Sequence, residues 1–305
     1  MSTIGIDIGG SKALAVRLDA GALADQQHTA RRRGPLVDVA LAAIRSVWAD
    51  DVESVGVGIA GLVQWPEGVF SWGPHVDGTN IPLKALLEEE LDVPVAVDND
   101  ANVAAFGERV AGAARGFDDF LLVTLGTGIG GAIVINGSVY RGESFAGEWG
   151  HIRHDPTGLL CDCGKRGCWE TVASGPALVR LAREVMSLNP EGSLAGRFGS
   201  RAITGEDVTA AADSGDEVAR GLVAEVGSEL GRGLANLIAV FDPELVVVGG
   251  GLGSVGESLL GPARRVAAES LHGGNHRMLP PILMAGAGPR AGAIGAAYLA
   301  SSIRS

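Results

Sequence analysis

The 305-residue sequence has few aromatic residues, few cysteines and no excess of basic charge. Aromatic residues make up 5% of it, cysteine occurs 3 times, and 24 lysines and arginines against 36 acidic residues give a formal net charge of -12. A surplus of acid repels nucleic acid and anionic membranes, so neither is expected as a partner. No uninterrupted apolar run reaches about 18 residues, and the first residues, MSTIGI, lack the basic start of a signal peptide. We therefore expect a cytoplasmic protein without a membrane span.

The rest of the composition indicates a folded chain. Apolar residues account for 46% and charged residues for 20%, and the 47 glycines and 13 prolines fall short of the combined share typical of low-complexity disorder, about 25 to 30%. The length suits about two domains at roughly 150 residues each.

Glycine is the residue in excess, and it gathers in four groups that mostly follow apolar runs. The groups are IGIDIGGSK at residues 4–12, GVGIAG at 56–61, LGTGIGG at 125–131 and VVVGGGLG at 246–253. Glycine after a strand allows a tight turn and lets the backbone approach a ligand closely. The four groups are therefore candidate binding turns.

Apolar runs and turn residues predict alternating strands and helices, which is the pattern of an α/β protein. Strands are expected at residues 4–8, 13–18, 55–59, 95–97, 121–125, 131–135, 245–248 and 282–284, and helices at 83–91, 98–110, 218–241, about 254–271 and about 289–302. A strand, a glycine turn and a second strand occur twice, which predicts two similar halves. We place one domain at residues 1–112 plus about 289–305 and the other at 113–288, with residues 189–205 as a surface loop.

The first glycine turn brings together groups that suit a polyphosphate. Asp7 ends an apolar strand, and Gly9, Gly10, Ser11 and Lys12 follow it. A carboxylate, backbone N–H groups and an ammonium group at one turn can hold a polyphosphate and its Mg2+. The turn matches neither the Walker loop nor GxGxxG, so a plain hairpin turn stays an alternative. Lys12 on its own suits a solvated lysine almost as well.

Two further glycine turns extend this prediction of a nucleotide site. The candidate phosphate-binding residues there are Gly126, Thr127 and Gly128 in the second turn and Gly249, Gly250 and Gly251 in the third. Three glycine turns after three strands favour phosphate binding over three unrelated hairpins.

The segment DNDAN at residues 98–102 places two carboxylates and two amides at a strand-to-helix junction. One of them is expected to cap the helix. A carboxylate there can also accept the proton of a substrate hydroxyl, and an ordinary aspartate suffices because phosphoryl transfer depends mainly on positioning.

All three cysteines, Cys161, Cys163 and Cys168, lie within eight residues. One disulfide would leave an odd thiol in a reducing compartment, so a Cys3His zinc site is the better interpretation, with buried cysteines as the alternative. His151 and His154 are both candidates for the fourth ligand. Four protein ligands leave no open position, which predicts a structural Zn2+. Glu148, His151 and Glu170 near this cluster could pair with vicinal hydroxyls or could be ordinary surface groups.

In DIGGSK, NDAN, LGTGIGG, AGEWGH, CDCGKRGCWE and VVVGGGLG, in that order, the chain resembles the ROK sugar kinases (repressor, open reading frame, kinase), and most closely their bacterial glucokinases. The resemblance covers nearly the whole chain. It implies that Asp100 is the catalytic base and that Asn99, Glu148, His151 and Glu170 bind sugar. It also implies that His151 is the fourth zinc ligand, with its other ring nitrogen on the sugar.

The resemblance further implies the actin-like/hexokinase fold, two ribonuclease-H-like domains with ATP and sugar meeting in a central cleft. The last helix would pack on the first domain, and the protein would form a homodimer or homotetramer. The expected reaction is ATP-dependent phosphorylation of a hexose at its 6-hydroxyl, with glucose first and N-acetylmannosamine, N-acetylglucosamine or another hexose as alternatives. Residues 64–80 lie where the family contacts sugar and leave this choice open.

The alternative from another class is a non-catalytic, sugar-sensing regulator of the same family. A repressor would carry an N-terminal winged helix, whereas the phosphate motif here begins at Asp7, so we expect no DNA binding. A sensor without catalysis would be expected to lose its base, yet Asp100 is present. Polyphosphate as the donor is less favoured than ATP because relatives that use it carry another glycine motif.

Overall fold

The computed structural model describes residues 2–10, 12–30, 34–74 and 76–303. The chain divides into two compact units. Unit 1 comprises Met1–Leu122, Ala132–Gly147 and Gly286–Ser305, and unit 2 comprises Val123–Gly131 and Glu148–Ala285. The domain limits expected from the sequence, at residues 113 and 289, stay a prediction.

The central sheet of unit 1 has the strand order β3-β2-β1-β4-β7. Its strands are β1 (Ser2–Ile8), β2 (Lys12–Asp19), β3 (Ala22–Ala30), β4 (Val52–Ile59) and β7 (Val95–Asn99). β1, β2 and β3 pair antiparallel, whereas β1, β4 and β7 pair parallel. A two-stranded sheet of β5 (Leu62–Gln64) and β6 (Val69–Trp72) follows β4 in the chain. The carboxyl ends of β1, β4 and β7 therefore meet at one edge, beyond Asp7 and Asn99.

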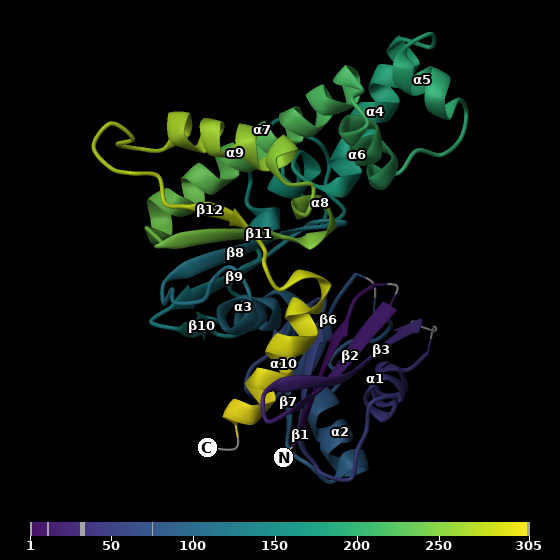
Figure 1. Cartoon of the computed structure of the whole chain (residues 1–305), viewed down its shortest axis with the longest axis vertical. Helices are drawn as coiled ribbons and strands as arrows, with labels where there is room; N and C mark the ends of the chain where they lie inside the picture. The colour runs from purple at the N-terminus through teal and green to yellow at the C-terminus, as the bar shows by residue number, and fades with distance from the viewer. Residues whose placement is uncertain (1, 11, 31–33, 75, 304–305) are drawn as a thin grey trace. The chain divides into compact units, whose positions relative to one another are not determined.

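Helices cover both faces of this sheet (Figure 1). They are α1 (Leu36–Arg45), α2 (Leu83–Leu91), α3 (Asp100–Ala111) and, after the short turn η3 (Gly288–Arg290), α10 (Ala291–Ser302). Ile4 and Ile6 belong to the core shared with α1 and α2. Because strand side chains alternate, Gly5 faces the opposite side, where α10 lies. As the resemblance implies, the last helix packs on unit 1.

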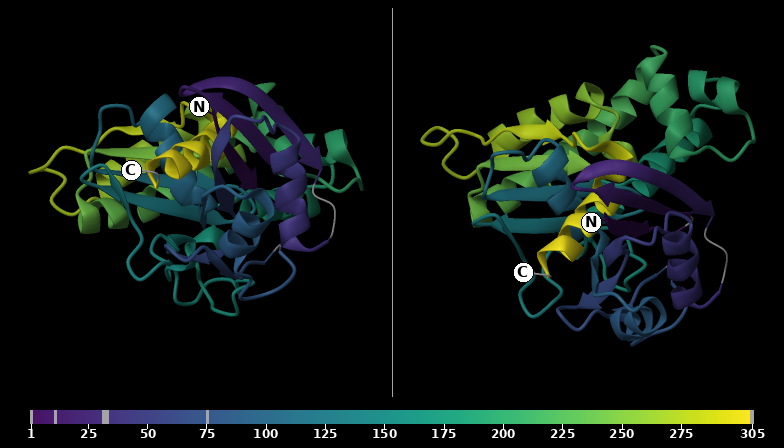
Figure 2. Two further views of the ribbon diagram at one scale, coloured as in Figure 1. Left: turned by 90° about the horizontal axis from the view of Figure 1, so that it is seen from below. Right: turned by 60° about the horizontal axis from the view of Figure 1, so that its bottom comes forward.

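The contact between α10 and the sheet depends on glycine. A β-carbon at Gly5 would lie 1.9 Å from the carbonyl oxygen of Ala293, and one at Gly56 would lie 1.8 Å from that of Ala296. Glycine at both places lets the helix backbone rest directly on the strands. Figure 2 shows the yellow α10 beside the purple strands β1 and β2 in both views.

The second sheet has the order β10-β9-β8-β11-β12, which repeats the connectivity of the first. Its strands are β8 (Phe120–Leu125), β9 (Ile129–Ile135), β10 (Ser138–Tyr140), β11 (Leu245–Gly249) and β12 (Ile282–Met284). Three consecutive strands come first and β11 and β12, which pair parallel, complete the sheet. The hairpin predicted twice from the sequence is present as β1 with β2 and as β8 with β9.

The helices of unit 2 are α4 (Gly175–Leu188), α5 (Ser193–Phe198), α6 (Gly205–Asp213), α7 (Glu217–Phe241), α8 (Gly250–Gly253) and α9 (Glu257–Ser270), with the 3-10 turns η1 (Trp149–His151) and η2 (Trp169–Thr171). The helical spacing predicted α7, which starts at the capping side chain of Asp216 and ends where Asp242 turns left-handed. α7 packs on α9. None of the described helices combines the length and hydropathy needed to cross a membrane.

Residues 189–205 are not a plain surface loop as predicted, since they contain α5. The helix forms because Leu194, 2% exposed, is buried between α5 and its neighbours α4 and α7. A six-residue helix with one buried apolar residue leaves too short a pattern to recognise in the sequence.

Candidate active site

In unit 1, the first glycine turn lies directly after Asp7. The N–H of Gly9 donates to the carbonyl of Lys12 at 3.0 Å, which closes the turn between β1 and β2. Asp7 is half-buried, and Lys12 is exposed at the start of β2. Ser11, another predicted phosphate contact, lies outside the described residues.

The carboxyl group of Asp7 has a pKa well above the ordinary aspartate value. The pKa of Asp7 is raised to about 7, mainly by burial and also by the charge of Asp100, while Lys12 acts to lower it. Unit 1 therefore brings two carboxylates close enough to repel each other, beside one ammonium group. A divalent cation carried by ATP would relieve that repulsion.

Asn99 and Asp100 lie where β7 passes into α3. Oδ1 of Asn99 caps the helix by accepting from the N–H of Ala101 at 2.8 Å, and its Nδ2 donates to the carbonyl of Gly61 at 3.1 Å. The predicted cap is thus Asn99, which leaves Asp100 in the first turn of α3. Burial raises the pKa of Asp100 above the ordinary aspartate value, while the N–H of Ala101 lowers it. Asp100 is half-buried.

In unit 2, the second and third glycine turns lie against each other. The N–H of Gly126 donates to the carbonyl of Gly128 at 3.0 Å, which tightens the turn between β8 and β9. Gly250 has φ +81°, and a β-carbon there would lie 2.3 Å from the carbonyl oxygen of Leu125. Glycine is required at 250 by both conformation and space. The predicted phosphate contacts of these two turns therefore belong to one neighbourhood.

Two 3-10 turns carry the predicted sugar-binding groups of unit 2. Glu148 precedes η1, which ends at His151, and Glu170 lies in η2. The N–H of Trp169 donates to the carbonyl of Ile152 at 3.0 Å, so the two segments lie side by side. A β-carbon at Gly128 would lie 2.4 Å from Oε2 of Glu170, which places that carboxylate against the second glycine turn.

Two tryptophans anchor these 3-10 turns. Nε1 of Trp149 donates to the carbonyl of Gly130 on β9 at 3.2 Å. Nε1 of Trp169 donates to the carbonyl of Glu229 on α7 at 3.0 Å. The indoles also fill the space that a side chain at Gly131 or Gly233 would need. Both predicted sugar-binding turns are thus attached to regular elements of unit 2.

His151, Cys161, Cys163 and Cys168 form a cluster whose ligand atoms all lie within 4.8 Å of one another. Sγ of Cys163 lies 3.5 Å from Sγ of Cys168, and Sγ of Cys161 lies 3.7 Å from Nδ1 of His151. Zn–S bonds of about 2.3 Å in a tetrahedron put two sulfurs about 3.8 Å apart, so the cluster fits zinc. Burial and the neighbouring Glu170 raise the pKa of the Cys161 thiol, and a bound cation would favour its thiolate.

His154, the other histidine considered as a ligand, has a different partner. Nε2 of its ring lies 2.8 Å from Oε2 of Glu229, and its backbone N–H donates to the carbonyl of Gly167 at 2.7 Å. The structure therefore places His151, and not His154, in the cluster.

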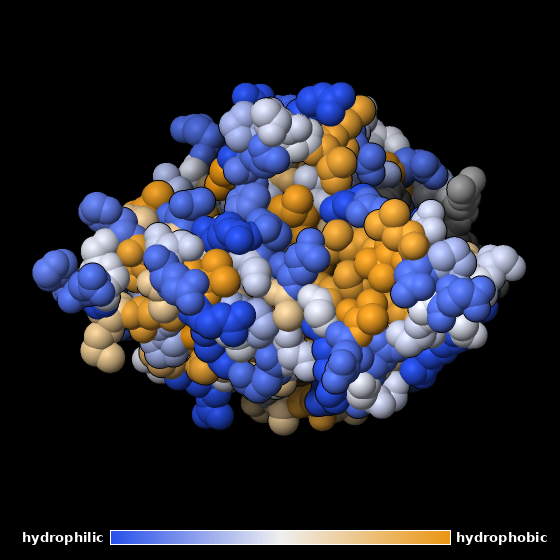
Figure 3. Space-filling model, turned by 90° about the horizontal axis from the view of Figure 1, so that it is seen from above, coloured by the Kyte–Doolittle hydropathy of each residue, from blue (hydrophilic) through white to orange (hydrophobic). Residues whose placement is uncertain are grey.

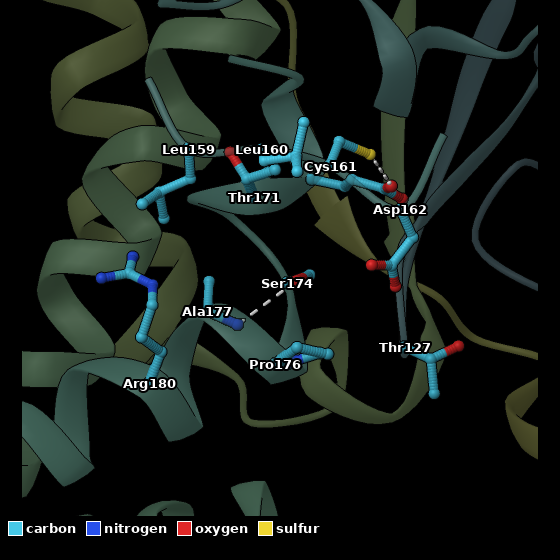
Figure 4. A pocket seen from close by; sticks show the side chains of 11 residues that line it. Thr127, Leu159, Leu160, Cys161, Asp162, Thr171, Ser174, Pro176, Ala177 and Arg180 are labelled. Atoms are coloured by element: carbon cyan, nitrogen blue, oxygen red, sulfur yellow. Dashed lines mark hydrogen bonds between the residues drawn. The ribbon is translucent and has the colours of Figure 1, made fainter. Parts of the chain in front are cut away.

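A pocket of about 200 Å³ opens between the second glycine turn and the cysteine loop (Figure 4). Thr127 lies at one side of it, Cys161 and Asp162 lie at another, and Arg180 on α4 lies across from them. A dashed line in Figure 4 marks the bond from Sγ of Cys161 to Oε1 of Glu170, 2.9 Å. The pocket thus joins a predicted phosphate contact, a predicted metal ligand and a predicted sugar contact within one unit.

Sequence reasoning assigned no role to several groups of these neighbourhoods. Arg180 and Asp162 line the pocket, and Asp98 and Arg141 form a buried ion pair next to Asn99. The partners of that pair are 43 residues apart in the chain. No motif or periodicity connects positions at that separation, so the pairing had no signal in the sequence.

The ROK family profile matches residues 3–303. A glucokinase of Streptomyces coelicolor is 38% identical over 98% of this chain and 97% of its own length. The crystal structure of a ROK family glucokinase from Streptomyces griseus in complex with glucose and AMPPNP is 41% identical, with a TM-score of 0.90 over 99% of this chain and 100% of that one. A xylose repressor of Caldicellulosiruptor bescii is 32% identical over 70% of this chain and 53% of its own length. The predicted actin-like/hexokinase fold is confirmed.

Proposed function

The chain belongs to the ROK family, and we propose that it transfers the γ-phosphoryl group of ATP to the 6-hydroxyl of glucose. The observation that carries this proposal is the likeness over the full length to a glucokinase solved with glucose and AMPPNP. Asp100 at the start of α3 supplies the one acid–base group that the reaction needs.

Asp100 is the proposed general base. As the 6-hydroxyl oxygen forms its bond to the γ-phosphorus, the bond from that phosphorus to the β,γ-bridging oxygen breaks and ADP leaves. The hydroxyl proton passes to the carboxylate of Asp100. The raised pKa of Asp100 makes it a better proton acceptor than an ordinary aspartate, provided that it is ionised when the sugar binds.

The remaining predicted residues hold the two substrates. We assign Asn99, Glu148, His151 and Glu170 to the sugar hydroxyls, since each offers a polar side chain on an anchored turn. We assign Asp7, Gly9, Gly10, Ser11, Lys12, Gly126, Thr127, Gly128, Gly249, Gly250 and Gly251 to ATP. Asp7 would help to hold the Mg2+ that neutralises charge on the phosphates.

For the cysteine loop we propose a structural zinc on Cys161, Cys163, Cys168 and Nδ1 of His151. Four protein ligands close the site, so the ion would hold the loop and take no part in transfer. Nε2 of His151 would then point away from the metal and donate to the sugar, with the metal fixing the tautomer.

A homodimer or homotetramer is the proposed assembly. Large apolar side chains are exposed in unit 2, Leu188 at 86% and Val240 at 74%, and Figure 3 shows apolar groups gathered among polar ones on one face. The cytoplasm is the proposed location because the reaction consumes ATP and the thiols need a reducing compartment.

A sugar-sensing regulator is the second proposal, and the observation that supports it is the similarity to xylose repressors. A coupled assay for ADP release separates the two proposals and also tests the sugar, and formation of the sugar phosphate is measured where polyphosphate is the donor. We expect kcat/KM with MgATP to be highest for glucose among glucose, mannose, fructose, N-acetylglucosamine and N-acetylmannosamine, with polyphosphate a poorer donor. A site that pairs hydroxyls rejects analogues that leave one unpaired. An acetamido sugar ahead by more than about tenfold would replace glucose as the substrate, and no turnover with any sugar would favour the regulator.

A further inference from the structure

Asp98 is a buried carboxylate. It directly precedes Asn99, which we assign to the sugar, and Asp100, the proposed base. Its side chain is 1% exposed. Oδ1 accepts from the backbone N–H of Asn99 at 2.8 Å and from Nδ2 of Asn102 at 2.9 Å. These two bonds hold residues on either side of Asp100, one at its N-terminal neighbour and one in the first turn of α3.

The other carboxylate oxygen of Asp98, Oδ2, pairs with Arg141, which follows β10 in the chain. Nε of Arg141 donates to Oδ2 at 2.8 Å, and Nη2 lies 2.7 Å from the same atom. The arginine side chain is 12% exposed. A charge pair buried to this degree costs much more to break than a surface pair, because either partner alone leaves an unpaired buried charge.

Aromatic rings fix the guanidinium in place. Its central carbon lies 4.1 Å from the ring centre of Trp65 and 6.0 Å from that of Phe106 on α3. The segment that carries Arg141 also holds the backbone of Trp65, because the backbone N–H of Trp65 donates to Oγ of Ser144 at 3.1 Å. Arg141 therefore links three parts of unit 1: the end of β7, helix α3 and the segment that begins at β5.

We propose that Arg141 is a positioning residue for phosphoryl transfer, acting through Asp98 to hold the Asn99–Asp100 turn in its productive place. The proposal rests on the proposed function, because it needs Asp100 to be the base. Among the described residues, Arg141 contacts Asp98, Val139, Trp65 and Phe106, none of which is assigned to a substrate. A displacement of the base by about 1 Å can cost about 10²-fold in rate. A residue that acts on the base only through Asp98 can therefore control turnover.

A single and a double variant of the chain test the proposal. Arg141→Met leaves the charge of Asp98 unpaired and should lower kcat for glucose by roughly 10- to 100-fold. The KM for ATP should stay within about twofold, since the proposed ATP contacts lie on other residues. Adding Asp98→Asn removes the unpaired charge while Oδ1 can still accept from Asn99 and Asn102. The double variant should therefore be at least about tenfold faster than Arg141→Met.

The matched control is Arg109→Met on α3. Arg109 pairs with Asp118, also at 2.7 Å, but the two side chains are 38% and 69% exposed, and kcat should not change. All rates are taken at least 15 °C below each variant's melting temperature. Should Arg141→Met not fold, Arg141→Lys replaces it, since a lysine keeps the charge but cannot make both the Nε bond to Asp98 and the Nη1 bond to Val139.

Three results overturn the proposal. One is a kcat of the Arg141 variant within about threefold of the wild type, the second is a double variant no faster than the single one, and the third is an equal loss in the Arg109 control. If the wild-type protein phosphorylates no hexose, the proposed function fails and the positioning proposal fails with it. If the wild type turns over normally and the Arg141 variant is unaffected, only the positioning proposal fails.

Discussion

A β-carbon added at Gly292 would lie 2.5 Å from Oδ2 of Asp7. Gly292 lies in the first turn of α10, the last helix of the chain, and Asp7 lies near the end of the first strand. The carboxylate that we assign to the phosphates and Mg2+ is thus in contact with the backbone of a helix nearly 300 residues away in sequence. The position of Asp7 depends on residue 292 being glycine.

Gly292→Ala should displace the Asp7 carboxylate and lower kcat with MgATP by roughly tenfold or more, while the affinity for glucose changes little. The matched control is Gly221→Ala on α7, where a β-carbon meets nothing within 4 Å and alanine favours a helix. Steady-state rates and calorimetry with glucose check both. Unchanged rates in Gly292→Ala would mean that Asp7 tolerates the shift or has no part in transfer.

Asp7→Asn should stabilise the protein without ligands at neutral and alkaline pH. The pKa of Asp7 is about 7 in the folded state against 3.8 ordinarily, so its ionisation favours the unfolded state, and stability is lost as pH rises from about 4 to about 7. Asparagine does not ionise. The melting-temperature advantage of the variant should therefore grow from pH 5 to pH 8. An advantage that is constant with pH, or absent, would contradict the raised pKa.

Asp100→Asn keeps the shape of the side chain and removes the proton acceptor, so kcat should fall by roughly 10² to 10⁴ with glucose still bound. In the wild type, kcat/KM should fall as pH drops through a value above the ordinary aspartate pKa of about 3.9, because burial raises the pKa of Asp100. The control is Asp213→Asn, at an exposed residue at the end of α6. Near-normal turnover of the Asp100 variant would assign the base to another group.

Cys168→Ser should lower both zinc content and glucose affinity. Elemental analysis of freshly purified wild type should give about one zinc per chain, and loss of a thiolate ligand should loosen the loop that carries Glu170 and cost about 10-fold in affinity. His154→Asn serves as the control, since His154 pairs with Glu229 outside the cluster, and it should keep its metal. Wild-type protein without zinc would refute the assignment.

Local patterns predicted much of the fold. The helical spacing of α7 and the apolar runs of β1 and β8 extend over enough residues to be recognised. β3 and α1 are not among the predicted elements. β3 is a polar edge strand whose place follows from backbone pairing with β2 rather than from apolar alternation.

The site was predicted as far as its groups lie in short motifs. Residue type and spacing indicated a functional carboxylate in the segment at residues 98–102 and a metal cluster around the three cysteines. The choice of Asn99, Asp100 and His151 came from the resemblance to the ROK family. The pairing of Asp98 with Arg141 and the contact of Asp7 with Gly292 join distant segments. Such contacts follow from how elements pack, which one sequence does not encode locally.

The glycine contact between α10 and the sheet also sets the order in which unit 1 can be completed during synthesis. Gly5 and Gly56 receive the backbone of α10, yet the ribosome adds that helix after every other helix and strand that the structure describes. At about 5 to 20 residues per second, the stretch between strand and helix takes on the order of 15 to 60 s to translate. Throughout that time one face of β1 and β4 lacks its contact with the backbone of α10. Catalytic activity should therefore appear after α10 has left the ribosome, however early the first strands form.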